Sequence, residues 1–179
     1  MDSEQDSKLV REVLQGHHRA FEEIVDRYKK PVFNVAFRMT GDASEAEDVT
    51  QAVFVKAYEN LSSFNLHRKF FSWLYRIAIN EALNAKHARK AGNSICESVI
   101  SDDKNPYELL HEKDRCHTID VALKKLNDDY RLVIVLRHFQ DLSYSEIAEI
   151  LQVPEKTVKS RLFTARQQLR EILIRSEIV

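Results

Sequence analysis

Apolar residues recur every three or four positions along most of the chain, which is the spacing of one face of an α-helix. In the first half, this period predicts one or two amphipathic helices over residues 8–31. Pro31 can begin the next helix, because its missing N–H costs nothing in a first turn. Four acids between residues 42 and 48 favour another helix start, since they complement the positive end of the helix dipole. After the loop SSFNLHRKFF, a long helix is predicted from Phe70 to about Ala91.

The second half contains the pattern of two helices joined by a tight turn, in LSYSEIAEILQVPEKTVKSRLFTARQQL. Ser143 and Glu146 predict a capping box at the start of the first helix. Residues 152–154, Gln-Val-Pro, interrupt the apolar period, and Pro154 suits the first turn of a second helix. The second helix carries its predicted buried stripe at spacings of four, three and four, on Val158, Leu162, Ala165 and Leu169.

Composition supports an all-α fold, since only three Gly and three Pro occur in 179 residues. Between the two helical parts, residues 94–114 hold six acids and two bases, together with several helix breakers. We therefore predict two small helical domains, residues 1–92 and 115–179, joined by an acidic linker over residues 93–114, with a helix-turn-helix in the C-terminal domain.

The charge of the chain is nearly balanced, with 27 Lys and Arg against 28 Asp and Glu. A bulk nucleic-acid binder is usually basic, so any such function must come from local asymmetry. Residues 156–175 have that asymmetry, because they hold six bases and one acid. The face opposite the buried stripe carries Lys156, Lys159, Ser160, Phe163 and Arg166. This arrangement fits a helix in the DNA major groove, although an ordinary solvated helix face remains an alternative.

A second basic segment lies in the first half, where residues 67–90 hold six bases, one acid and four aromatic residues. Positive charge beside aromatic rings is typical of single-stranded nucleic-acid binding. Arg76, Asn80 and Asn84 are spaced by four and share one helix face. Asn is a poor helix former but can read base edges, so stability does not explain this stripe. Trp73 lies at core spacing and is predicted to be a core residue.

Together the two halves resemble a bacterial sigma factor of the extracytoplasmic-function (ECF) group, and the likeness covers nearly the whole chain. AFEEIVDRY, AEDVTQAVFVKAY and FFSWLYRIAINEALN look like sigma region two. LSYSEIAEILQVPEKTVKSRLFTARQQLRE looks like region four. The resemblance implies a non-enzymatic protein that directs core RNA polymerase to the promoters of a stress- or envelope-responsive regulon and helps to melt them.

The resemblance also implies site residues. Those that contact the clamp helices of the largest polymerase subunit are Glu47, Asp48, Gln51 and Phe54. Those that capture bases of the minus-ten element are Asn65, His67, Arg68, Lys69, Arg76, Asn80 and Asn84. Those that read the minus-thirty-five element as duplex are Lys156, Thr157, Lys159, Ser160, Arg161, Phe163 and Arg166. The linker would run toward the RNA exit, the second domain would meet the polymerase flap, and an anti-sigma factor would cover both domains.

The chain departs from the family pattern in one loop and at two single positions. Asn65–Lys69 stands where the family often has an Arg-Gly-acid loop, which leaves the preferred minus-ten base open. Gln152 and Lys156 stand where Gly is common, and Lys156 can add a phosphate contact.

Two other functional classes compete with this interpretation. One is a dimeric helix-turn-helix regulator that binds a palindromic operator, whereas a sigma factor is expected to be monomeric when free. The other is an enzyme or zinc protein built on Cys96, His111, Cys116 and His117, but their spacing matches no standard ligand motif. We expect no cofactor, metal or catalytic residue. The polar N-terminus and the lack of a long apolar run predict a cytoplasmic protein without membrane insertion.

Overall fold

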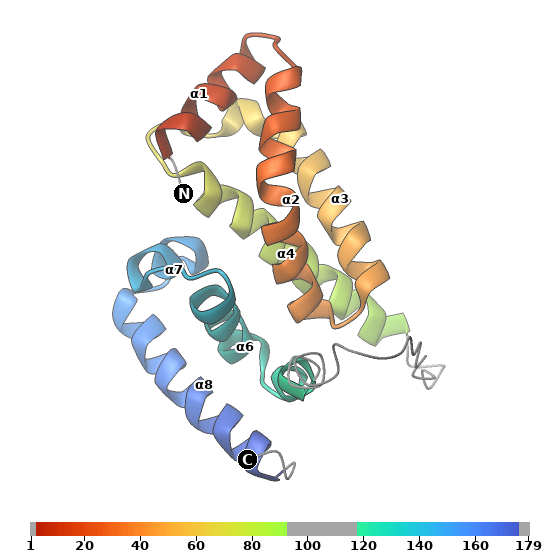
Figure 1. The fold of residues 1–179 in the computed structure, drawn as a ribbon, viewed down its shortest axis with the longest axis vertical. Helices are drawn as coiled ribbons and strands as arrows, with labels where there is room; N and C mark the ends of the chain where they lie inside the picture. Colours follow the sequence, from red (N-terminus) through yellow and green to blue (C-terminus); the bar gives the residue numbers. More distant parts are fainter. Residues whose placement is uncertain (1–2, 93–117, 176–179) are drawn as a thin grey trace, which may run out of the picture.

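The computed structural model describes residues 3–92, here called the N-terminal half, and residues 118–175, the C-terminal half. The predicted linker over residues 93–114, which contains Cys96 and His111, lies outside the described residues, as do Cys116 and His117. Within the described ranges the chain forms helices and turns without a β-strand, which confirms the all-α prediction (Figure 1).

The N-terminal half consists of four helices and a short 3-10 turn. Helix α1 (Ser3–Leu14) and helix α2 (Arg19–Thr40) are separated around Gly16, whose φ of 94° is left-handed. Gly41 ends α2 with a φ of 76°, and Asp42 caps α3 (Ala43–Glu59) by accepting a hydrogen bond from the Glu45 N–H at 2.8 Å. The turn η1 (Leu61–Ser63) and a loop then lead to α4 (Phe70–Gly92), whose bounds agree with the sequence prediction.

Pro31 is a correction to the sequence analysis, because it lies inside α2 and does not begin a helix. A proline in a helix interior removes one hydrogen bond and costs about 3 kcal/mol. Tyr28, Val32 and Val35, on either side of it, are buried against neighbouring helices. Burial of this continuous stripe offsets the local cost, and sequence pattern alone did not reveal it.

The C-terminal half begins with a helix over residues 118–124. Asn127 caps α6 (Asp128–Ile134), which continues into the wider π-type turn η2 (Val135–Phe139). Then α7 (Tyr144–Leu151) and α8 (Glu155–Arg175) form the predicted helix-turn-helix. None of the described helices contains a stretch long and apolar enough to cross a membrane.

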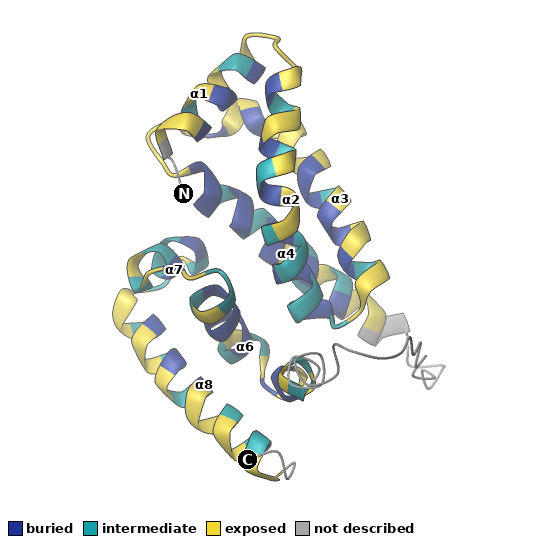
Figure 2. Cartoon of the chain, viewed as in Figure 1, coloured by how far each residue is buried: buried dark blue, intermediate teal, exposed yellow. Residues whose placement is uncertain are grey.

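The two halves pack against each other, with α4 against α7 and α2 against α6 and η2. Their buried residues belong to one continuous hydrophobic cluster. Figure 2 shows this burial as dark bands on the inward sides of the helices, whereas the outer side of α8 is largely exposed. The arrangement therefore places the predicted minus-ten helix beside the helix-turn-helix.

Arg131 lies at the contact between the two halves, where α4 meets α7 and α2 meets α6 and η2; this contact is here called the joint. It is only 3% exposed, and burial lowers the pKa of its guanidinium. Within the C-terminal half it donates hydrogen bonds to the carbonyl oxygens of Leu123 at 2.8 Å, Lys124 at 2.6 Å and Leu126 at 3.2 Å. A fourth hydrogen bond, of 2.9 Å, reaches the carbonyl of Met39 near the end of α2. One side chain thus satisfies helix-end carbonyls on both sides of the joint.

A cationic side chain of α2 makes a second contact across the joint. The Arg38 guanidinium lies 3.8 Å from the centroid of the Phe139 ring and 3.7 Å from Asp120. Lys124 donates a hydrogen bond of 2.9 Å to the carbonyl of Gly41, at the end of α2. The end of α2 is therefore held by contacts from three elements of the C-terminal half.

Candidate nucleic-acid interface

The turn before α8 fixes the direction of that helix. The Ser143 side chain and the Glu146 carboxylate cap α7 reciprocally, as the sequence predicted. Gln152 then takes a left-handed conformation with φ 54°, and the Val153 N–H donates to the Ala148 carbonyl at 3.1 Å. The next helix starts at Glu155, so the turn contains only a few residues and holds α8 close to α7.

The two sides of α8 differ as the sequence predicted. Val158, Leu162 and Ala165 are buried, and Leu169 is half-buried. The opposite side, here called the α8 face, is exposed and consists of Lys156, Lys159, Ser160, Phe163 and Arg166. Phe163 is 64% exposed, which is unusual for a large apolar side chain. The predicted Thr157 is half-buried beside this face.

The cations of α8 are in different electrostatic surroundings. Lys159 forms an ion pair of 2.7 Å with Glu155 one turn away, and this pairing raises the pKa of its amine. Arg161 is half-buried and pairs with Asp129 of α6 at 2.7 Å. Of the seven predicted minus-thirty-five residues, Arg161 alone thus directs its charge toward the joint between the halves.

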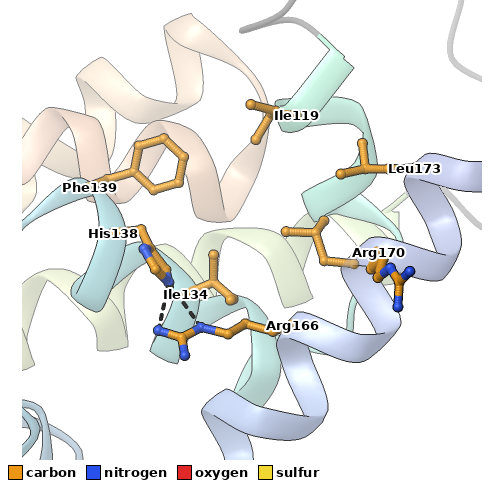
Figure 3. Close-up of a pocket in the computed structure, with 8 residues that line it drawn as sticks. Ile119, Ile134, His138, Phe139, Arg166, Arg170 and Leu173 are labelled. Carbon is orange, nitrogen blue, oxygen red and sulfur yellow. Dashed lines mark hydrogen bonds between the residues drawn. The ribbon is translucent and has the colours of Figure 1, made fainter. Parts of the chain in front are cut away.

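An apolar groove borders the α8 face (Figure 3). Its volume is about 460 Å³, and it lies between residue 119, the end of α6, η2 and α8. Arg166 donates from Nε to His138 Nε2 at 3.3 Å across the groove mouth. Burial lowers the pKa of His138, and the positive charges of Arg166 and Arg137 lower it further. His138 is therefore held neutral and accepts the hydrogen bond.

The predicted minus-ten residues lie on the loop before α4 and on α4 itself. Asn65, His67, Arg68 and Lys69 are exposed, and the Asn65 carboxamide oxygen accepts a 2.9 Å hydrogen bond from the His67 N–H. Lys69 forms an ion pair of 3.1 Å with Glu146 of the C-terminal half. The loop therefore presents its charges outward except for Lys69, which is engaged across the joint.

The α4 stripe consists of Arg76, Asn80 and Asn84, and its first two residues lie at the edge of the joint. Arg76 and Asn80 line a cavity of about 240 Å³ together with Asp129, Gln152 and Arg161 of the C-terminal half. Arg76 is half-buried, whereas Asn80 and Asn84 are exposed. The tertiary structure thus brings part of both predicted DNA surfaces to one cavity, which sequence spacing could not show.

Asn80 also borders a second cavity on the side of α4 that faces α3, with a volume of about 270 Å³. Trp73 lines it and packs its ring against Phe64 and Phe70, at centroid distances of 5.3 and 5.6 Å. Trp73 is half-buried and packs against the hydrophobic core, so it lies at the edge of the predicted core, and one part of its surface faces this cavity.

The predicted polymerase contacts lie on α3. Glu47, Asp48 and Gln51 are exposed, and Glu47 and Gln51 border a hollow of about 610 Å³ between α2 and α3. Phe54 is only 8% exposed and packs edge-on against Phe21. It therefore lies under the exposed α3 residues and is largely inaccessible to a partner in this structure.

Sequence reasoning missed two exposed residues on α3. Val55 is 56% exposed and Tyr58 is 44% exposed. Together with Asp48 and Gln51 they follow spacings of three, four and three, so they extend one continuous helix face. Their offset from the buried stripe of Val49, Val53 and Ala57 was the available signal.

Within the described ranges, no group of three or more His, Cys, Asp or Glu side chains is arranged to hold a metal ion. Asp42 and Glu146 instead cap helices, and Glu146 also pairs with Lys69.

Comparison with known proteins decides the family. The family model "Sigma-70 region 2" matches residues 24–92, and "Sigma-70, region 4" matches residues 116–169. The ECF RNA polymerase sigma factor SigW of Bacillus subtilis (strain 168) is 38% identical over 93% of this chain and 95% of its own length. The chain belongs to the ECF sigma factors of the sigma-70 family. As an ECF sigma factor, it directs promoter recognition and transcription initiation, and its family consists generally of non-enzymatic transcription regulators.

Other relatives of this ECF sigma factor agree. The RNA polymerase sigma-H factor of Pseudomonas aeruginosa is 34% identical and covers 97% of this chain and 96% of its own. The ECF RNA polymerase sigma-E factor of Escherichia coli (strain K12) is 34% identical, with 92% of each chain covered.

Two solved structures share the fold over both halves. CnrH in complex with the cytosolic domain of CnrY has a TM-score of 0.76 and 26% identity, covering 95% of this chain and 97% of CnrH. The sigma factor RpoE in complex with the anti-sigma factor NepR from Bartonella quintana has a TM-score of 0.69 and 25% identity, covering 86% and 96%.

Proposed function

We propose that this ECF sigma factor divides promoter reading between its two halves. In this proposal α8 reads the minus-thirty-five element as duplex, and α4 with its preceding loop holds the unpaired minus-ten strand. The observation that carries it is the two-sided character of α8. Val158, Leu162 and Ala165 anchor one side, and three cations and an exposed aromatic ring form the other.

Duplex reading by α8 follows from side-chain chemistry. Lys159 and Arg166 are exposed on α8, and a good base contact in the major groove is worth about 1–3 kcal/mol of discrimination. Lys156 and Thr157, near the start of the helix, would contact phosphates, because a helix N-terminus favours anions. Arg161 is assigned to the same surface but must leave Asp129 before it can contact DNA.

Minus-ten capture would use the cavities beside α4. Removing a base from the stack costs a few kcal/mol, so a shaped pocket is needed to offset that cost. Asn80 borders both cavities, and its carboxamide can donate to and accept from a base edge. Asn65, His67 and Arg68 are exposed on the adjoining loop, and Asn84 is exposed on α4, where they can contact the same strand.

Core RNA polymerase is the proposed principal partner. The α3 face of Glu47, Asp48 and Gln51 would meet basic residues of the clamp helices, and the second half would meet the flap. The chain has 27 basic and 28 acidic residues, so its net charge gives little attraction to DNA phosphates. Strong promoter binding is therefore expected only with polymerase, and the proposal places the chain in the bacterial cytoplasm, where transcription occurs.

An anti-sigma factor is the proposed second partner. The NepR complex is described as that of an anti-sigma factor, and CnrH was solved with a domain of CnrY. Both likenesses extend over most of this chain.

We also propose bounds for the domains: region two over residues 1–92, the linker over 93–114 and region four over 115–179. The free form is proposed to be monomeric, and the regulon is proposed to respond to stress or to the state of the envelope.

Run-off transcription tests the proposal. Purified protein is added to bacterial core RNA polymerase and fragmented genomic DNA, and transcript starts are mapped. New starts that share two spaced upstream motifs support it. We expect Lys159→Ala to weaken dependence on the upstream motif and Asn80→Ala to weaken dependence on the downstream one, each by about ten-fold.

A result without new transcripts, and without co-elution with core polymerase, would contradict the proposal. Glu23→Gln, at an exposed position of α2, is the control for nonspecific effects of substitution.

A further inference from the structure

Lys159, one of the cations of the α8 face, contacts a residue outside its own helix. Its Nζ lies 5.6 Å from the centroid of the Tyr144 ring, and Tyr144 is the first residue of α7. A cation within about 6 Å of an aromatic centroid is attracted by the negative face of the ring. Lys159 also pairs with Glu155 of α8 at 2.7 Å. Its direction is therefore set by both helices of the helix-turn-helix.

The Tyr144 ring is itself held in place. It is half-buried and packs against the hydrophobic core. The Arg137 guanidinium lies 5.8 Å from the centroid of this ring. Arg137 in turn forms an ion pair of 3.1 Å with Asp141 and donates a hydrogen bond of 3.1 Å to the Leu142 carbonyl. Lys159 is thus oriented by a ring that is anchored in the fold.

Arg166, a second cation of the α8 face, is oriented by a side chain of η2. Its Nε donates to His138 Nε2 at 3.3 Å, and its Nη2 lies at the same distance from that nitrogen (Figure 3). One edge of the guanidinium therefore faces His138. Because a guanidinium has five N–H donors, this contact leaves other donors of Arg166 for a base or a phosphate.

Both contacts come from one short segment, residues 138–144, which joins η2 to the start of α7. Long cationic side chains lose rotamer freedom when they bind a partner. A contact that already holds them near the bound direction reduces this loss. Because an exposed contact between a cation and a ring is weak, it can orient the cation without preventing it from binding DNA.

We propose that Tyr144 and His138 are positioning residues for the reading of duplex DNA by α8. Tyr144 orients Lys159 and His138 orients Arg166, so the preference for particular bases depends on residues that precede the reading helix. Attraction to phosphates tolerates many side-chain directions, whereas a base edge is contacted in only a few. This inference rests on the proposed role of α8 in reading the minus-thirty-five element.

The test for Tyr144 uses holoenzyme and the upstream motif found by run-off transcription. The position that Lys159 reads is the one at which Lys159→Ala removes the base preference. Competition filter binding with duplexes that differ only at this position gives the discrimination ratio between the preferred base and each of the others. Tyr144→Leu removes the ring and keeps an apolar side chain. Tyr130→Leu, at a half-buried position near the start of α6, is the matched control.

We expect Tyr144→Leu to lower the discrimination ratio at the Lys159 position about two- to five-fold, because the ammonium loses the ring that orients it. The salt dependence of binding should not change, since the number of cations on α8 stays the same. Tyr144→Phe should keep the ratio, because it keeps the ring. In a chain that already carries Lys159→Ala, Tyr144→Leu should cause no further loss of discrimination. The control should leave the ratio unchanged.

Three results would overturn the role of Tyr144. Equal losses of discrimination in Tyr144→Leu and Tyr144→Phe would assign the effect to the hydroxyl group. A loss that persists in the Lys159→Ala background, or that appears equally in the control, would show that Tyr144 does not act through Lys159. An upstream motif whose discrimination Tyr144→Leu leaves unchanged would overturn the inference alone. The lack of any upstream motif would instead overturn the proposed function, and the inference with it.

His138 is tested in the same assay at the position where Arg166→Ala removes the base preference. His138→Leu should lower discrimination there about two-fold, because Arg166 loses one hydrogen-bond acceptor. His138→Gln should retain most of the discrimination, since its amide oxygen can accept from the same guanidinium. Equal losses in the two variants, or no loss in either, would overturn the role of His138.

Discussion

The α8 face and the α4 stripe are both helix surfaces with predicted DNA contacts, but they differ in how far the rest of the structure leaves their side chains accessible. On α8, Lys156, Lys159 and Arg166 are exposed; Lys159 pairs with Glu155 of the same helix, and Arg166 contacts the neutral His138 ring. On α4 and its loop, Lys69 and Arg76 meet carboxylates or a cavity wall of the other half. Local sequence is therefore enough to build an accessible surface, whereas access to α4 depends on how the halves pack.

Arg131→Ala should have the largest effect, because it breaks the joint on which the comparison depends. It removes hydrogen bonds to three carbonyls of the C-terminal half and to the carbonyl of Met39 in α2, and of these acceptors the Leu123 carbonyl keeps the hydrogen bond from the Leu126 N–H. We expect a loss of about 3–4 kcal/mol in the free energy of unfolding, measured by chemical denaturation. Arg175→Ala, at the exposed end of α8, is the control and should change stability by under about 0.5 kcal/mol. A similar loss in both variants would show that the joint is not the cause.

Two substitutions within α8 compare an exposed arginine with one that is already paired with an acid. Arg166→Ala should reduce duplex binding to the minus-thirty-five motif about ten-fold, because Arg166 lies on the exposed face. Arg161→Ala should reduce it by less than about two-fold, since its guanidinium already pairs with Asp129. Run-off transcription first identifies the upstream motif. Filter binding of holoenzyme to a duplex that carries this motif then measures the loss of affinity in each variant. Equal losses would mean that Arg161 leaves the joint when the complex forms.

Gln152→Gly tests the turn that sets the direction of α8. A non-glycine residue with a φ of 54° carries a left-handed strain of about 1–2 kcal/mol, part of which Gly relieves. We expect the variant to be more stable by about 0.5–1 kcal/mol in chemical denaturation, with unchanged duplex binding. Gln167→Gly, on the exposed side of α8, should instead destabilise by about 1 kcal/mol. Destabilisation at both positions would contradict a strained turn.

The smallest predicted effect is the pH dependence that His138 adds beside the α8 face. Its folded pKa is lowered below the ordinary value of about 6.5, so its neutral form contributes stability above that pH. This contribution is lost as the pH falls through the folded pKa. Solvent partly screens the charge of His138. We therefore expect its contribution to the free energy of unfolding to be smaller at about pH 5.5 than at about pH 7.5, by under about 1 kcal/mol.

His138→Gln is the variant that isolates this effect, because it keeps a neutral acceptor for Arg166 and cannot titrate. The measured quantity is the change in unfolding free energy between the two pH values. It should be smaller in the variant than in the unsubstituted chain. The same change in both proteins would show that other groups carry the pH dependence.

Several features followed from local sequence because their causes are local. The capping box at Ser143, the acid-rich start of α3 and the buried stripe of α8 each depend on residues within one or two turns. Pro31 was misassigned because its cost is local, whereas the burial that compensates for it comes from other helices. The exposed α3 residues Val55 and Tyr58 were missed because their apolar character was taken as a sign of burial, although both are offset from the buried stripe of α3.

The sequence by itself determined the all-helical fold, the helix-turn-helix with its cationic face, and the polar stripe on α4, since helical periodicity and capping are set by near neighbours. The tertiary structure alone decided which cations are free. It pairs Lys69 with Glu146 and Arg161 with Asp129. It also buries Arg131 between the ends of helices that are far apart in sequence. These contacts depend on the packing of whole helices, so spacing along the chain could not reveal them.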